Sequence, residues 1–153
     1  MIEDLKPATR YTIRVIAEGT AGRSAPSAPL LIKTEPQRPG GPPLHVNVRP
    51  MSSTEILITW SPPLAELRHG EILGYNIGFK ETSASSYTFT NVSGDGEEGG
   101  EYLLTGLSKY TRYSIVVQSF NQVGPGPQSE PISTQTLEDG KRSWRICRRD
   151  IVY

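Results

Sequence analysis

The sequence predicts an all-β protein: a seven-stranded antiparallel sandwich preceded by two strands of another. Three observations predict this fold. Apolar residues alternate with polar ones in short runs, the period of a strand with one buried face. Turn-forming residues, 15 glycines and 13 prolines, separate these runs along the whole chain. The chain also contains an internal repeat with an offset of 102 residues, the size of one small domain.

The repeat relates the start of the chain to its last third. The two copies read Leu5-x-Pro7-x-Thr9-x-Tyr11-x-Ile13-x-Val15 and Leu107-x-Lys109-x-Thr111-x-Tyr113-x-Ile115-x-Val117, and they align without a gap to Thr34 and Thr136. Because the match begins at Leu5, the first copy holds only the end of a domain. We therefore expect four parts: a C-terminal remnant at 1–36, a Pro/Gly-rich linker at 37–43, a complete domain at 44–137, and a basic tail at 138–153.

Seven short runs divide the complete domain into strands. They lie near residues 44–48, 56–60, 75–79, 87–91, 102–104, 113–119 and 129–136. The run at 87–91 is the more polar one, which is typical of an edge strand. Seven strands in fewer than 100 residues are the pattern of an antiparallel sandwich.

Four motifs carry a family resemblance. They are Trp60 on the second strand, Gly74-Tyr75-x-Ile77-x-Phe79, Leu107-x-x-x-Thr111-x-Tyr113 and Asn121-x-x-Gly124. With these motifs the chain resembles the fibronectin type III family, which implies an immunoglobulin-like sandwich. The resemblance makes Tyr113 a tyrosine corner, whose phenol bonds back to nearby backbone. It implies a structural core of Trp60, Tyr75, Ile77, Leu107, Tyr113, Ile115 and Val117. Lys109 departs from the family's usual proline and should loosen its turn slightly.

Three further segments resemble the Down syndrome cell adhesion molecule group: Thr34–Pro39, Glu66–Gly70 and Phe120–Pro127. This resemblance implies the extracellular part of a neuronal surface receptor, with homophilic adhesion, self-avoidance and axon guidance. Its partners would be proteins, including homophilic contacts through other domains of the receptor. The alternatives are another receptor, such as a receptor tyrosine phosphatase or a sidekick-type adhesion protein, and a purely structural spacer. An exposed apolar sheet face would favour binding, and a polar face a spacer.

Motifs for chemistry are weak, and we expect no enzyme, cofactor, metal or small-molecule substrate. Gly94-x-Gly96-x-x-Gly99 matches a dinucleotide fingerprint, but its acidic residues would repel phosphate, and it is expected to lie between strands. A calcium site at Asp95, Glu97, Glu98 and Glu101 would be held by a mobile glycine-rich loop. The two histidines, His45 and His69, have no zinc-site spacing to any cysteine.

The charge and the cysteine content further restrict which partners and structural features the sequence allows. Residues 40–137 contain five basic and nine acidic residues, a net charge of −4, which excludes a nucleic-acid footprint on this domain. Cys147 is the one cysteine, so no internal disulfide can form. No apolar run follows Met1 as in a signal peptide, and no run is long enough for a membrane span. An extracellular location therefore rests on the family resemblance.

Asn91-Val92-Ser93 is a sequon for N-linked glycosylation, expected near an exposed edge strand. At the two ends of the chain we expect less order. An isolated two-stranded remnant is marginal in water, so the first copy should fray or pack on the complete domain. The tail from Gly140 is either a basic amphipathic membrane anchor or, as we favour, a disordered segment without selected function. Gly140-Lys141 is compatible with a translated splice-donor sequence.

Overall fold

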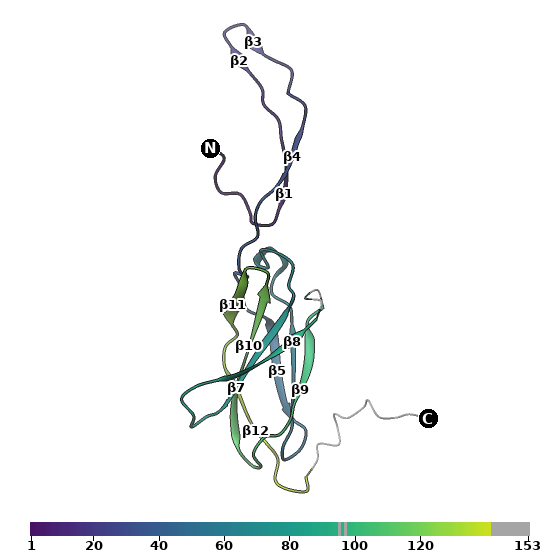
Figure 1. Cartoon of the computed structure of the whole chain (residues 1–153), viewed down its shortest axis with the longest axis vertical. Helices are drawn as coiled ribbons and strands as arrows, with labels where there is room; N and C mark the ends of the chain where they lie inside the picture. The colour runs from purple at the N-terminus through teal and green to yellow at the C-terminus, as the bar shows by residue number, and fades with distance from the viewer. Residues whose placement is uncertain (95, 97, 142–153) are drawn as a thin grey trace, which may run out of the picture. The chain divides into compact units, whose positions relative to one another are not determined.

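A computed structural model describes residues 1–94, 96 and 98–141 (Figure 1). The chain divides into two compact units, Met1–Gln37 and the chain from Arg38 onward. The expectations for the tail beyond Lys141, and for Asp95 and Glu97 as ligands, lie outside the described residues.

The second unit is a sandwich of two antiparallel sheets. The smaller sheet has the order β5-β6-β9, formed by Leu44–Pro50, Ile56–Ser61 and Gly100–Leu104. The larger has the order β11-β10-β7-β8, formed by Gly124–Gln128, Arg112–Asn121, Gly74–Glu81 and Thr88–Ser93, and β12 (Ile132–Gln135) also pairs with β10. A short 3₁₀ helix at Ala65–Leu67 lies between β6 and β7. The all-β sandwich predicted from the sequence is confirmed.

Strand alternation builds the core between the two sheets. Alternate residues of β6, β7, β9 and β10 form one buried cluster, because successive side chains of a strand point to opposite faces, and Ile72 and Leu107 join it from outside the strands. That cluster comprises Ile56, Ile58, Trp60, Ile72, Tyr75, Ile77, Leu104, Leu107, Tyr113, Ile115 and Val117, and it contains all seven core residues named from the sequence. The Trp60 and Tyr75 rings pack at 5.2 Å between centroids. Full burial of a side chain such as Ile58 contributes about 1.5–3 kcal/mol.

The last strand differs from the sequence prediction. It begins at Gly124, which pairs with Asn121, rather than near Ser129, and it is broken into β11 and β12. Ser129 lies at the break, where its backbone N–H donates to the Val117 carbonyl and its hydroxyl accepts from the Val117 N–H at 2.9 Å. The side chain therefore completes the strand pairing where the regular ladder is interrupted.

Residues 38–43 pack as part of the second unit. Pro39, Gly41 and Pro43 are buried, and the Gly40 N–H donates to the Leu67 carbonyl at 2.7 Å. A Cβ on Gly40 would lie 2.6 Å from the ring of His69, so only glycine fits this approach. The prolines and glycines of this segment thus fasten the start of the unit to the loop before β7.

The first unit is a hairpin of β1 (Arg10–Ile13) and β4 (Leu30–Lys33), with two short strands, β2 (Glu18–Gly19) and β3 (Gly22–Arg23), at its far end. Arg10 pairs with Lys33 just as Arg112, 102 residues later, pairs with Gln135. The hairpin therefore has the same register as β10 and β12.

Several hydrogen bonds of the first copy recur between the corresponding atoms of the second. The hydroxyl of Tyr11 accepts from the Lys6 N–H at 2.8 Å, as that of Tyr113 accepts from the Ser108 N–H at 2.9 Å. The turn with Lys109 keeps the bond that its proline counterpart makes, since Thr111 Oγ1 donates to the Lys109 carbonyl at 2.8 Å. The repeated sequence thus forms the same local hydrogen bonds in both copies.

The two copies differ in how far their apolar side chains are buried. Val117 is 0 % exposed, whereas its counterpart Val15 is 69 % exposed. Leu30 and Leu31 on the pairing strand are also exposed. The hairpin has the local bonds of the complete domain without the opposing sheet that would bury its apolar face.

Hydrogen exchange of the full chain should separate the two units. The amides of Ile77, Ile115 and Val117 should exchange only through global unfolding, because they lie in the paired core. The amides of Tyr11 and Ile13 should exchange much faster, because an isolated two-stranded hairpin is marginally stable. Exchange can be measured by mass spectrometry of peptic fragments. Equal protection of the amides in the two units would contradict this prediction.

Removing the Tyr113 hydroxyl should destabilise the sandwich. In Tyr113→Phe the Ser108 N–H loses its partner, and the free energy of unfolding should fall by about 1 kcal/mol. The repeat supplies a matched control, because Tyr11→Phe removes the same bond from the other copy. That variant should leave the main unfolding transition, followed by Trp60 fluorescence in urea, unchanged. An equal loss in both variants would show that the hairpin unfolds together with the sandwich.

Candidate interaction surface

The outer face of the larger sheet is the candidate surface. Tyr75 and Ile77 of β7 point into the core, so Gly74, Asn76 and Gly78 lie on the opposite face. Registers with the neighbouring strands determine what lies beside these residues. Because directly opposed residues share a face, the outer face continues from β7 onto β8 and β10.

Two glycines let aromatic rings lie across the central strand. A Cβ on Gly78 would lie 2.6 Å from the Phe89 ring and 2.8 Å from Val116, and one on Gly74 would lie 2.8 Å from the Phe120 ring. The rings come from the two strands that flank β7. They fill the space that a side chain would take, which compensates for the weak packing of glycine in a strand.

Tyr87 extends this aromatic row toward the start of β8. Its ring lies 6.2 Å from that of Phe89, and its hydroxyl forms a 2.8 Å hydrogen bond with Ser114. The ammonium of Lys80 lies 5.1 Å from the centre of the Tyr87 ring, a cation–π arrangement. These contacts hold Tyr87 beside Phe89 and against β10.

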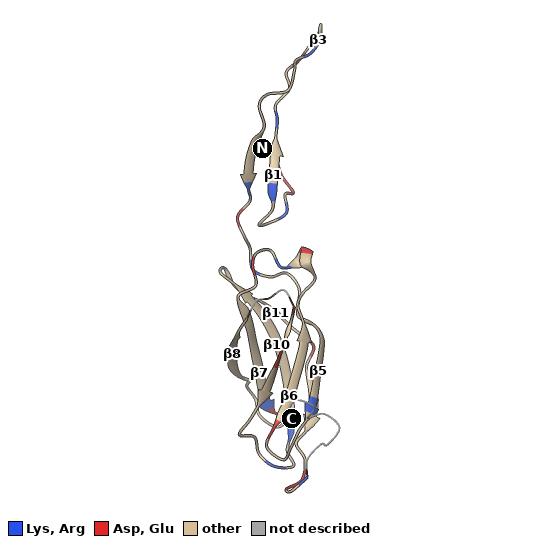
Figure 2. Cartoon of the chain, turned by 90° about the vertical axis from the view of Figure 1, so that its right-hand side faces the viewer, with Lys and Arg blue, Asp and Glu red and all other residues tan. Residues whose placement is uncertain are grey.

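Little of the row is accessible. Val116 is buried, and Tyr87 and Phe120 are half-buried. Phe89 is 47 % exposed. The strands of this unit carry few charges, which gather toward the loops and strand ends (Figure 2). The outer face therefore presents one exposed ring among polar groups, a small apolar area for a protein partner.

Asn91 lies on this face and at the edge of the sheet. It is exposed on β8, the terminal strand of the sheet order, where it pairs with Asn76. Its amide Nδ2 donates to Asn76 Oδ1 at 3.1 Å. The sequence placed this residue near an exposed edge strand, and the structure places it two residues along the strand from Phe89.

The glycine motif has the wrong surroundings for a dinucleotide. Gly96 is buried against Ile72, and Gly99 adopts a positive φ of 79° close to the Trp60 carbonyl. Strand β9 follows at Gly100, where a phosphate-binding loop requires a helix. These glycines permit a close approach of the loop to the core.

The other chemical candidates stay apart. Among the described residues, no three acidic, histidine or cysteine side chains are grouped as metal ligands would be. His45 contacts the Ser61 hydroxyl at 3.3 Å, and His69 contacts the Arg38 carbonyl at 2.9 Å. Each histidine has a local structural contact.

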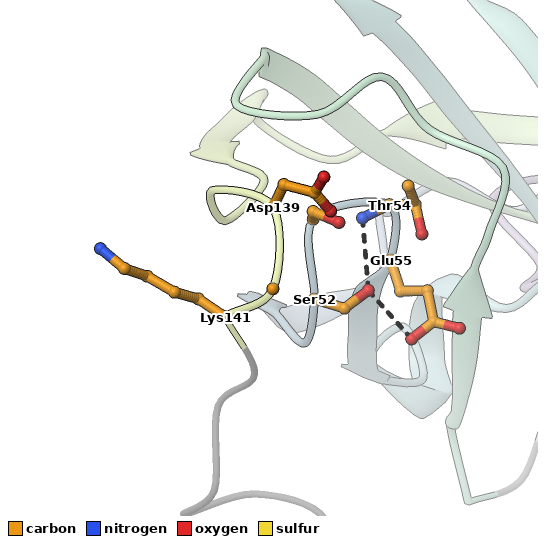
Figure 3. Close-up of a pocket in the computed structure, with 7 residues that line it drawn as sticks. Ser52, Thr54, Glu55, Asp139 and Lys141 are labelled. Carbon is orange, nitrogen blue, oxygen red and sulfur yellow. Dashed lines mark hydrogen bonds between the residues drawn. The ribbon is translucent and has the colours of Figure 1, made fainter.

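An open polar pocket lies at the loop between β5 and β6 (Figure 3). It has a volume of about 270 Å³ and is lined by Ser52, Ser53, Thr54, Glu55, Asp139, Gly140 and Lys141. The Ser52 hydroxyl donates to Glu55 Oε2 at 3.1 Å and accepts from the Thr54 N–H at 3.2 Å. Ser52 and Glu55 thus form a hydroxyl–carboxylate pair, and both hydrogen bonds lie within the turn itself.

One carboxylate at this pocket is shifted in pKa. Lys109 donates to Asp139 at 2.9 Å, and this hydrogen bond, with the attraction of the two charges, lowers the pKa of Asp139. The side chains of Lys109 and Asp139 are 55 % and 74 % exposed, so they form a surface ion pair rather than a buried catalytic acid with its partner.

Comparison with known sequences supports the resemblance. The chain is 66 % identical over 142 residues to the cell adhesion molecule Dscam2 of Drosophila melanogaster, a match covering 91 % of this chain and 7 % of the relative. It is 43 % identical to human DSCAML1 and 41 % identical to human DSCAM, with 90 % of this chain and 7 % of each relative covered. The chain thus spans about 7 % of the length of the curated relatives it matches.

Solved structures show the same fold. The FN1–FN3 domains of chicken CNTN1 superpose with a TM-score of 0.60 at 28 % identity, covering 90 % of this chain and 46 % of that one. The FN5 domain of Drosophila Lar gives a TM-score of 0.52 at 31 % identity, covering 64 % and 97 %. Domains d3–d4 of rat CD45 give 0.67 at 22 % identity, covering 88 % and 68 %, a likeness of fold.

The match to the Fibronectin type III domain family covers residues 41–135, which include both sheets, the buried tryptophan and the tyrosine corner of the second unit. The chain belongs to the fibronectin type III family.

Proposed function

We propose that the chain is a protein-interaction and spacer module from the ectodomain of a neuronal cell-adhesion receptor. One observation carries the proposal: the 66 % identity to the cell adhesion molecule Dscam2 over a match of 142 residues that covers 91 % of this chain. A match of that length must include parts of both units, because neither unit alone is so long. The similarity therefore extends beyond what one sandwich fold requires.

The receptor as a whole would act in homophilic adhesion, self-avoidance and axon guidance at the cell surface. Homophilic contacts would use its other domains, and this part would set their spacing. The small accessible apolar area on the outer sheet face supports a spacer role for this module. No helix in the described part of the chain is long and apolar enough to cross a membrane.

The domain division follows from the repeat. We propose that residues 1–36 are the last two strands of a preceding domain, joined through 37–43 to the complete domain at 44–137, with a non-family tail at 138–153. Support comes from the matched register of β1–β4 and β10–β12, and from the exposed Val15, whose counterpart is buried. Residues 38–43 would then fix the start of the second domain rather than act as a loose connector.

A different receptor with the same repeats is the alternative. The single FN5 domain of Drosophila Lar is 31 % identical over the part of this chain that it matches, whereas Dscam2 is 66 % identical over a match that reaches into both units. The higher identity over both units favours the Dscam-type origin.

A chimera tests the function. In the chimera, residues 1–137 would replace the matching segment of Dscam2. The ectodomain of the chimera would then be coupled to beads. The chimera should cluster beads as well as the parent does, while an ectodomain from which the segment is deleted clusters them less, because the spacing changes. A chimera that is secreted and folded but does not cluster beads would overturn the proposal.

Extension of the chain tests the domain division. Adding the Dscam2 residues that precede the match should complete the first sandwich, and the amides of Tyr11 and Ile13 should become as protected as those of Tyr113 and Ile115. Extension with a scrambled segment of equal length is the control. Unchanged exchange in the extended chain would show that residues 1–36 are not the end of such a domain.

A further inference from the structure

We propose that Asn91 carries an N-linked glycan whose first sugar packs on the ring of Phe89 and covers the outer sheet face at the β8 edge. The proposal rests on the proposed function, because N-glycosylation requires passage through the secretory pathway. It assigns an occupant to the one exposed aromatic ring of the candidate surface.

Accessibility of the acceptor is the first argument. Asn91-Val92-Ser93 is the one Asn-x-Ser/Thr sequon in the 153 residues, and the side chains of Asn91 and Ser93 are exposed. In the described sheet β8 pairs with β7 alone, so its other edge is open. A sugar chain on this strand has room to extend without displacing a neighbouring strand.

Strand geometry brings Asn91 and Phe89 together. Residues two apart in a strand lie on one face, about 7 Å apart. Registers confirm the shared face, since Phe89 opposes Gly78 and Asn91 opposes Asn76. A pyranose ring is close to this spacing in width, and its C–H groups favour the electron-rich face of an aromatic ring.

Hydrogen bonding of Asn91 is compatible with modification. Nδ2 of an asparagine amide has two hydrogens, and one of them already donates to Asn76 Oδ1. In the transfer, Nδ2 loses one proton and bonds to C1 of the sugar, while the C1–O bond to the diphosphate of a lipid-linked donor breaks. The remaining N–H can still donate to Asn76, which would fix the direction of the first sugar.

A glycan here would also protect the sheet edge. Exposed edge strands can pair with strands of other molecules, and β8 has no proline and no charged residue along its length. A hydrated sugar chain beside Asn91 blocks that pairing sterically.

The full chain, secreted from cultured animal cells behind an added signal peptide, tests the acceptor. The product should carry one glycan, seen as a mass shift that peptide-N-glycosidase removes. Asn91→Gln and Ser93→Ala should each lack it, while Asn76→Gln, on the adjacent strand, should retain it. A secreted wild-type chain without the glycan would overturn this proposal. The bead-clustering result would stand independently of it.

Thermal unfolding tests the contact with Phe89. Trimming the glycan to one sugar should leave a chain that melts about 3 °C above the unglycosylated Ser93→Ala variant, since only the first sugar touches the ring. That difference should vanish when both chains also carry Phe89→Thr. It should persist with Leu103→Thr, a control residue of similar exposure on the other sheet, 42 % against 47 %. An unchanged difference in the Phe89→Thr pair would overturn the packing.

Discussion

Strand β10 is the element on which the rest of the sandwich depends. It pairs with β7 along one side and with β11 and β12 along the other, so the strand order of the larger sheet is built around it. Its residues Ile115 and Val117 are fully buried between the sheets. The Tyr113 hydroxyl ties its start to the preceding turn. One strand thus connects the order of the larger sheet, the core and the turn. In the first unit, β1 has the matching register but pairs with β4 alone.

Inner-face features could be predicted from the sequence. Alternation at Ile56, Ile58 and Trp60 reports directly on burial, because a strand with one wet face has a period of two. The internal repeat predicted that the first copy consists of the last two strands of a domain, and the family resemblance identified Tyr113 as a tyrosine corner. These signals are local or periodic, so they can be detected in a single sequence.

Features that depend on neighbouring strands could not be predicted. The early start of the last strand at Gly124 depends on a tight turn closed by Asn121 Oδ1, which accepts from the Val123 and Gly124 N–H groups. The aromatic row was hidden because Phe89 and Phe120 are far apart in sequence. They lie on one face only because β8 and β10 flank the same strand, and only because Gly74 and Gly78 leave room for them.

Residues on the outer face also distinguish the hairpin of the first copy from that of the second. By the 102-residue offset, Arg14 corresponds to Val116 and Glu18 to Phe120. If the first hairpin took the place of β10 beside β7, the inner face would fit, but a guanidinium and a carboxylate would lie over Gly78 and Gly74. Both charges would lose water without gaining a partner there. Exchange of hairpins between the two copies would thus be disfavoured by the outer face rather than by the core, where Tyr11, Ile13 and Val15 repeat Tyr113, Ile115 and Val117.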